Sequence, residues 1–193
     1  SVMREIAQEE LLPRFKTLAR NDVWEKERGG TVTVADLESE RRLQQALTDL
    51  VPGSLVLAEE DAEENPEAIQ YLNQAAPVWI VDPLDGTTNF LHGLPHFCVS
   101  IALARDNEVI AGVIFDPIKD EVFWAERGIG AFVNSRRLRV SGRGRMDEAI
   151  LATGVPFKMH DDETVDLFIE QLRPIMKQTA GVRRYGAAAL DLA

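Results

Sequence analysis

The sequence is poor in cysteine: Cys98 is the only one among 193 residues. A single thiol cannot form an intramolecular disulfide, so a disulfide-stabilised fold is excluded. Cys98 lies within the apolar run 97–104, which is typical of a buried structural thiol and not of a nucleophile. His92 and His96 have no cysteine or suitably spaced histidine beside them and are poor candidates for metal ligands.

Long apolar segments are also missing from the sequence. No stretch approaches the roughly 20 residues that a membrane-spanning helix requires. The first ten residues do not show the basic and then apolar pattern of a secretion signal. We therefore expect a cytoplasmic protein without a membrane partner.

Basic residues are the minority among the charged ones, with 21 Lys and Arg against 32 Asp and Glu and a formal net charge of -11. A broad nucleic-acid-binding surface is therefore not expected. Residues 136–145 contain five arginines, for which a solvated strand edge and turn is the simplest interpretation. With 45% hydrophobic residues, the chain has enough apolar side chains to bury a sizeable core.

Helical periodicity occurs near both ends of the chain. Residues 2–19 predict a helix that is kinked or split at Pro13. A second helix is predicted to begin near Asp36 and to end near Pro52. The buried face of this second helix is expected to carry Leu37, Leu43, Ala46, Leu47 and Leu50. Other helices are expected over residues 66–73, over 161–177 with an interruption at Pro174, and from Gly186 onward.

The middle of the chain has the pattern of short strands. These are predicted over residues 54–57, 78–81, 97–104, 109–115, 122–125 and 131–133. The strands 97–104 and 109–115 flank a short polar turn, as in an antiparallel hairpin. This succession of strands fits an antiparallel sheet.

A cluster of oxygen ligands follows the strand at residues 78–81. The chain there continues as Asp82-Pro83-Leu84-Asp85-Gly86. Pro83 restricts the backbone, so the Leu84 carbonyl can turn toward the same point as the carboxylates of Asp82 and Asp85. Such an all-oxygen set suits Mg²⁺. A plain turn is the competing interpretation, because Asp, Pro and Gly are common turn residues.

A second acidic cluster, Glu59-Glu60-Asp61, follows the strand at residues 54–57. Taken alone it would be read as a solvated loop. Both acidic clusters come directly after short apolar strands, which favours a shared site. Residues 86–88 are then expected to begin a short helix whose free N–H groups face a phosphate, and bound cations would make this acidic site receptive to that anion.

Residues 79–90 closely resemble the most specific motif of the inositol monophosphatase family. Residues 57–61 resemble the upstream Gly-Glu-Glu segment of that family, with Ala58 where Gly is usual. Further similar segments are Lys26 with residues 31–36, residues 128–132, and residues 183–189, where Ala187 replaces the common Ser or Thr. The resemblance covers nearly the whole chain.

The resemblance implies an α+β fold, a layered αβαβα sandwich of the inositol monophosphatase and fructose bisphosphatase kind. Residues 1–145 would form an N-terminal α+β portion with the metal loop, and 146–193 the start of a C-terminal α/β portion. The resemblance also implies a homodimer and inhibition by lithium.

The resemblance further implies a role for each site residue. Glu60, Asp82 and the Leu84 carbonyl would bind one Mg²⁺, and Asp82 and Asp85 a second. Thr87, with Asp36 nearby, would orient and help deprotonate the attacking water. Glu60 would also be a catalytic residue, because it binds the Mg²⁺. Glu59 is a weaker candidate, in hydrogen bonding to the ligands or in binding a further metal. The substrate-binding residues would be Asp85, Gly86, Thr87, Gly186, Ala187 and Ala188.

The sequence departs from the family pattern in one respect. The family completes its second metal site with an Asp in a Trp-Asp-x-Ala segment, and this sequence has no Trp-Asp pair. We therefore expect a C-terminal part to be missing, and we interpret Asp191 as a surface residue of a helix and not as that ligand.

The functional hypothesis is Mg²⁺-dependent hydrolysis of a small phosphate monoester, with inositol monophosphate as the first candidate. Histidinol phosphate, a sugar bisphosphate or a nucleotide 3'-phosphate are alternative substrates. A regulatory binding protein that keeps the fold is an alternative of a different class, and residues 136–145 would then be a contact surface.

Overall fold

The computed structural model describes residues 1–26, 30–155 and 161–193. Its largest element is a seven-stranded sheet whose spatial order follows the sequence from β3 to β9. All neighbouring strands are antiparallel except β3 and β4, which are parallel. The strands are β3 (Leu55–Ala58), β4 (Val78–Asp85), β5 (Cys98–Arg105), β6 (Glu108–Asp116), β7 (Glu121–Glu126), β8 (Gly130–Val133) and β9 (Arg136–Arg137).

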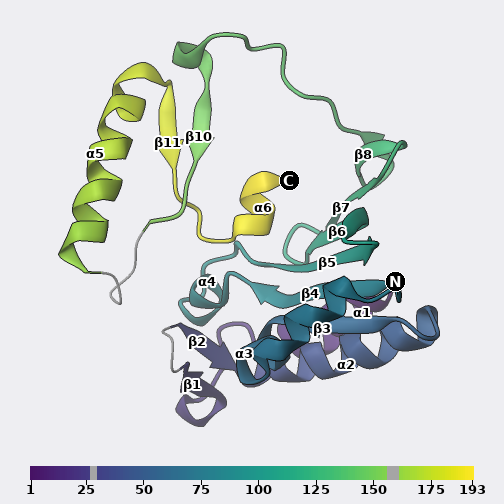
Figure 1. The fold of residues 1–193 in the computed structure, drawn as a ribbon. Coiled ribbons are helices and arrows are strands. Elements are labelled where there is room, and N and C mark those ends of the chain that lie inside the picture. The colour runs from purple at the N-terminus through teal and green to yellow at the C-terminus, as the bar shows by residue number, and fades with distance from the viewer. Residues whose placement is uncertain (27–29, 156–160) are drawn as a thin grey trace.

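The N-terminal helices cover one face of this sheet (Figure 1). They are α1 (Val2–Ile6), the π-helical turn η1 (Ala7–Leu11) and α2 (Val34–Leu50). The predicted helix over 2–19 ends early, because Pro13 lacks the N–H group that would continue it. The α+β prediction and the hairpin of β5 and β6 are confirmed.

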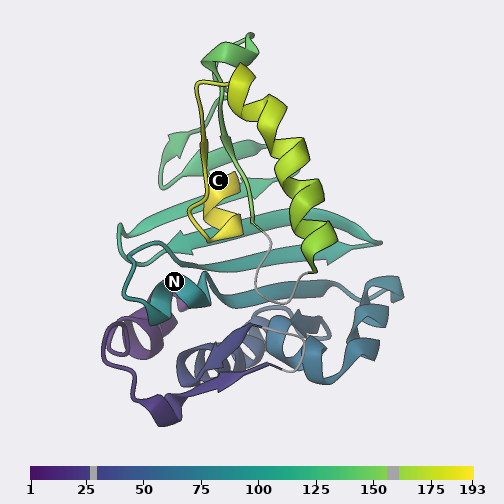
Figure 2. The ribbon, with the colours of Figure 1, turned by 90° about the vertical axis from the view of Figure 1, so that its left-hand side faces the viewer.

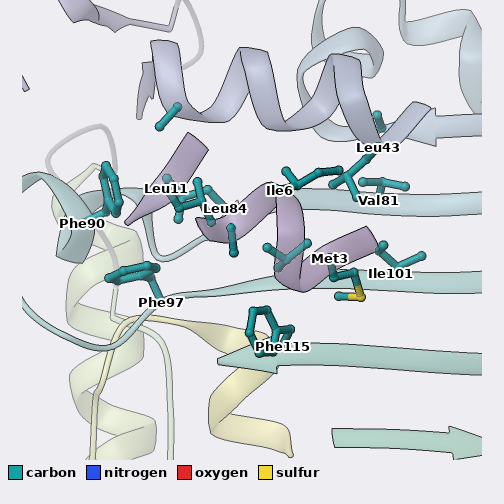
Figure 3. Packing of buried hydrophobic residues seen from close by; sticks show 14 of the residues in the cluster. Met3, Ile6, Leu11, Leu43, Val81, Leu84, Phe90, Phe97, Ile101 and Phe115 are labelled. Carbon is teal, nitrogen blue, oxygen red and sulfur yellow. The ribbon is translucent and has the colours of Figure 1, made fainter. Parts of the chain in front are cut away.

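The main core lies between these helices and the sheet. Figure 3 shows Ile6 and Leu43 from the helices against Val81 from β4. Phe15, Phe90 and Phe97 close one end of this core, with ring centroids 5.0–5.6 Å apart. These contacts fix the end of β4, where the acidic motif lies.

The buried face of α2 differs from the prediction. Leu37 and Leu50 are 41% and 67% exposed, so they do not belong to it. The buried positions are Ala35, Asp36, Ser39, Glu40, Leu43 and Leu47, which share one side of a helix by their spacing. Three of the six are polar because this part of α2 faces the acidic site and not only the core.

A smaller layer lies on the other side of the sheet (Figure 2). β10 (Ile150–Ala152) pairs in parallel with β11 (Gly181–Arg183), and α5 (Asp162–Gln178) and α6 (Ala188–Leu192) complete this layer. The predicted interruption of α5 at Pro174 does not occur. Pro174 lies near the C-terminal end of the helix, where its missing N–H removes a single helical hydrogen bond. The division into portions 1–145 and 146–193 remains a prediction.

Shorter elements connect these layers. They are η2 (Arg20–Asp22), β1 (Val23–Glu25), β2 (Thr31–Thr33), α3 (Glu59–Glu64), η3 (Pro66–Asn73), α4 (Thr87–Leu91) and η4 (Met146–Glu148). Cys98 is buried and unpaired, as predicted. In the described part of the chain, no helix is both long and apolar enough to span a membrane.

Candidate functional site

The acidic motif lies at an irregularity in β4. β4 pairs regularly with β5 as far as Asp82, and the register then shifts between Asp82 and Asp85. Pro83 cannot donate to a neighbouring strand, so it is suited to such a position. The Leu84 N–H instead donates to Asp82 Oδ1 at 3.0 Å. The motif is therefore a local bulge that turns its oxygens away from the regular ladder.

The second acidic cluster is the first turn of α3 and not the loop that its composition alone indicates. The N–H groups of Glu60 and Asp61 donate to the Glu40 carboxylate, at 2.9 and 3.0 Å. An anion at this end of a helix is favourable because the first N–H groups have no partner within the helix. Since β3 and β4 are parallel, with Ala58 beside Val81, the two clusters meet at the same end of the sheet.

The carboxyl groups of these clusters are crowded. Those of Glu59 and Asp82 lie close enough for Glu59 to raise the pKa of Asp82. Burial, and then the charges of Glu59 and Asp85, raise the pKa of Asp82 to about 8. Burial also raises the pKa of Glu60 to about 7, against the opposing effect of Lys26, and raises that of Asp85. Without a bound cation, Asp82 and Glu60 are therefore harder to ionise than ordinary carboxyl groups.

Lys26 is the main cation at this site. Its Nζ lies 2.9 Å from Glu59 Oε1, 2.8 Å from Glu60 Oε2 and 3.2 Å from Glu63 Oε2. Burial lowers the pKa of Lys26, but its bonds to Glu60 and Glu59 outweigh that effect and raise it overall. Lys26 is thus an ion-pair partner within the site and not a solvated surface lysine.

The donor chemistry of the site fits a hard divalent cation. Asp82, Asp85, Glu60 and the Leu84 carbonyl offer only oxygen, and the closeness of the carboxyl groups of Glu59 and Asp82 is the arrangement that a cation would relieve. No three acidic, histidine or cysteine side chains in residues 1–26, 30–155 and 161–193 already form a closed ligand cluster. A cation at Glu60 therefore requires Lys26 to give up part of its ion pairing.

We expect replacement of Lys26 by methionine to destabilise the chain in Mg²⁺-free buffer. The cost should be roughly 3 kcal/mol, because the charge of Glu60 loses its partner in a largely buried position. Saturating Mg²⁺ should restore more stability to this variant than to the wild type, since a divalent cation can replace the ammonium group. Urea unfolding with and without Mg²⁺ measures both effects.

Arg41→Met provides the matched control, because Arg41 pairs with Glu38 on the exposed side of α2. That variant should change the free energy of unfolding by less than about 1 kcal/mol. A Lys26→Met chain that is as stable as the control, or that gains no extra stability from Mg²⁺, would contradict the assigned electrostatics.

The predicted pair of Thr87 and Asp36 is brought together across 51 positions in the sequence. Thr87 begins α4, and its Oγ1 lies 3.1 Å from Asp36 Oδ1 and 3.0 Å from the Leu84 carbonyl oxygen. Asp36 is buried and accepts from the N–H and the hydroxyl of Thr33, at 2.8 and 2.5 Å. Burial raises the pKa of Asp36 to about 6, although the bonds from Thr33 oppose the shift.

The predicted substrate-binding residues of the C-terminal segment lie beside Asp85. The Ala189 N–H donates to Asp85 Oδ2 at 2.6 Å. A cavity of about 380 Å³ opens next to this contact. Its lining residues are Asp85, Ala152, Thr153, Gly154, Val155, Arg184, Gly186, Ala187, Ala188, Asp191 and Leu192.

Sequence analysis missed Thr153, Arg184 and Asp191 as cavity residues. Thr153 follows β10 and Arg184 follows β11, and the pairing of these two strands brings both to the cavity. Asp191 is 11% exposed and contacts His96, so its interpretation as a surface residue was wrong. No short motif marks these positions, because pairings between distant segments place them there.

The fold and the site together define a layered α+β protein with a carboxylate-rich strand end and a small cavity beside it. The model of the inositol monophosphatase family matches residues 2–193. The chain belongs to the inositol monophosphatase family.

Relatives with different names are similar to this chain. A Nus factor SuhB of Pseudomonas aeruginosa is 42% identical over 93% of the chain and 66% of its own length. An inositol-1-monophosphatase of Caulobacter vibrioides is 47% identical over 84% of the chain and 61% of its own length. The chain thus spans about three fifths to two thirds of the lengths of these relatives.

Solved structures of this family share the fold. The extragenic suppressor protein suhB of Bartonella henselae has a TM-score of 0.83, with 38% identity over 99% of this chain and 70% of that one. An inositol monophosphatase of Thermotoga maritima has a TM-score of 0.79, with 32% identity over 98% of this chain and 67% of that one. The predicted fold family is therefore confirmed.

Proposed function

We propose that this chain forms the Mg²⁺- and phosphate-binding part of a phosphomonoesterase that acts on a small alcohol phosphate. The observation that carries the proposal is the meeting of the two acidic clusters at the ends of the parallel strands β3 and β4, beside the hydrogen-bonded pair of Thr87 and Asp36. Membership of the family supports it. Inositol monophosphate is the first candidate substrate.

In this proposal Glu60, Asp82 and the Leu84 carbonyl hold one Mg²⁺, and Asp82 and Asp85 hold a second. Bound Mg²⁺ would lower the pKa of the attacking water and stabilise charge on the phosphoryl and leaving oxygens. Asp85 is the proposed ligand that lines the cavity, so the metal and the phosphate would lie at the Asp85 end of it.

The chain's own groups orient the water and the phosphate. Asp36 accepts a hydrogen bond from the Thr87 hydroxyl, which leaves the Thr87 oxygen able to accept a hydrogen bond from the water and to direct it toward phosphorus. The Gly86 and Thr87 N–H groups begin a helix and would donate to the phosphate oxygens. The alcohol would lie in the cavity of about 380 Å³, whose size suits a small ligand.

Replacement of Thr87 by valine should lower kcat by about 100-fold or more and change KM little. Valine keeps the shape of threonine but removes the hydroxyl that bonds to Asp36, and general acid–base groups contribute about 10²–10⁴ in rate. Thr87→Ser, which keeps the hydroxyl, should retain most of the activity. Equal losses in both variants would assign Thr87 a packing role instead.

The proposed activity is tested with two proteins: this chain, and a chimera in which residues 1–193 are followed by the part of the Caulobacter vibrioides relative beyond the match. Both are assayed for Mg²⁺-dependent phosphate release from inositol, histidinol, sugar and nucleotide phosphates. The ester from which phosphate is released fastest is the preferred substrate, which decides between inositol monophosphate and the alternative esters. Inhibition by lithium and homodimer formation are further expectations of the proposal, checked in the same samples.

A regulatory binding protein is the second candidate, because the Pseudomonas aeruginosa relative is named a Nus factor. Residues 136–145 carry five arginines, and Val140 among them is 97% exposed, so this segment can contact a partner. A chimera that binds Mg²⁺ but hydrolyses none of the esters would favour this candidate over the phosphatase.

A further inference from the structure

Two residues without a role in the proposed reaction contact each other near the cavity. His96 lies in the segment between α4 and β5, and Asp191 lies in α6, 95 positions later. His96 Nε2 is 3.1 Å from Asp191 Oδ1. The His96 ring also packs on Tyr185, with centroids 5.3 Å apart. We call the pair of His96 and Asp191 the latch.

A buried amide connects the same two segments next to the latch. Asn89 Nδ2 donates to the His96 carbonyl at 2.7 Å and to the Tyr185 carbonyl at 2.8 Å. Asn89 is itself 3% exposed. The segment before β5 and the segment before α6 are therefore bound to each other through both backbone and side chains.

The latch is one of the contacts that position α6. A helix of five residues is too short to be stable alone, so its position depends on tertiary contacts. The first turn of α6 lies on Asp85, where the Ala189 N–H donates to Oδ2 at 2.6 Å. Asp191, at the other end of α6, is the residue that His96 binds.

We propose that His96 and Asp191 are positioning residues for the metal ligand Asp85. The latch holds α6 so that the N–H group of Ala189 orients the Asp85 carboxylate toward the Mg²⁺ position. A carboxylate has about four lone-pair positions, so this N–H bond leaves others for a metal. This inference rests on the proposed function.

The chemistry of metal sites sets the size of the effect. Groups that orient a ligand without touching the metal typically change metal affinity by about 10–100-fold when they are removed. We expect Asp191→Ala and His96→Phe each to raise the Mg²⁺ dissociation constant about 10-fold. The double variant should be no weaker than the weaker single variant, because both substitutions break the same contact.

Isothermal titration of this chain with Mg²⁺ alone measures these constants without any substrate. Asp191→Asn and His96→Gln keep an acceptor and a donor, respectively, and should retain affinity within about 3-fold of the wild type. Asp147→Ala, which removes an exposed ion pair with Arg145, is the matched control and should have no effect. His96→Phe preserves the ring against Tyr185, so it carries the test if Asp191→Ala does not fold.

Amide hydrogen exchange of Ala189 provides a second measurement. This amide should exchange faster in Asp191→Ala and His96→Phe than in the wild type and the control, because its bond to Asp85 is weakened. If these two variants bind Mg²⁺ with wild-type affinity, or if the losses add in the double variant, the positioning role of the latch is wrong while the proposed function stands. A wild-type chain that binds no Mg²⁺ would instead overturn the proposed function on which the latch rests.

Discussion

Asp82→Asn should abolish the response of this protein to Mg²⁺. Asp82 is the residue shared by both proposed metal positions, and its carboxyl group is the one whose pKa Glu59 raises. Loss of a group that only orients a ligand costs about 10–100-fold in metal affinity, so loss of the ligand charge itself should cost at least about 100-fold in Mg²⁺ affinity and in phosphate release. Titration calorimetry and the phosphate assay measure the two effects.

The same substitution should not destabilise the fold in Mg²⁺-free buffer. Asparagine keeps the oxygen that accepts from the Leu84 N–H, and it removes a buried carboxyl group whose ionisation burial and the charges of Glu59 and Asp85 disfavour. The melting temperature without Mg²⁺ should therefore equal or exceed that of the wild type. A variant that melts lower and still binds Mg²⁺ would mean that Asp82 is a structural turn residue.

Gly86→Ala should destabilise the protein by about 2–4 kcal/mol. Gly86 has φ of +94°, which an L side chain rarely adopts. An added Cβ would also lie 3.0 Å from the His96 carbonyl oxygen and 3.1 Å from Ala187 Cβ. The substitution thus combines backbone strain with a steric clash against the segment that leads into α6.

Gly53→Ala separates these two causes. Gly53 has φ of +84°, but an added Cβ there meets no atom within 4 Å. Its substitution should cost only the backbone strain, about 1–2 kcal/mol. Denaturant unfolding of both variants gives the difference, which measures the contact of Gly86 with its neighbours. Equal costs would show that the close contacts relax without penalty.

Local patterns were sufficient to predict much of the site. Asp82 and Asp85 come after the apolar run 78–81 of β4, and Pro83 marks the point where pairing becomes irregular. These features depend on neighbours in the sequence, so a single chain reveals them. The meeting of Thr87 with Asp36 was expected only from the resemblance to the family, and the structure brings the two side chains together.

The wrong predictions concern residues whose environment is set by distant segments. Leu37 and Leu50 are apolar and were assigned to the buried face of α2, but that face turns toward the acidic clusters and buries Asp36 and Glu40. A count of apolar residues cannot reveal this, because burial of a carboxylate depends on donors elsewhere. For Glu40 those donors are the N–H groups at the start of α3.

The amino-acid sequence by itself determined the family, the succession of strands and the two acidic clusters, because each of these rests on local spacing and side-chain type. The tertiary structure alone decided that Lys26 forms ion pairs with the glutamates of α3 and that His96 binds Asp191. Such contacts join residues tens of positions apart, and their stability depends on how the layers pack. The physical reason is that hydrogen bonds and ion pairs act over a few ångströms in space, whatever the distance along the chain.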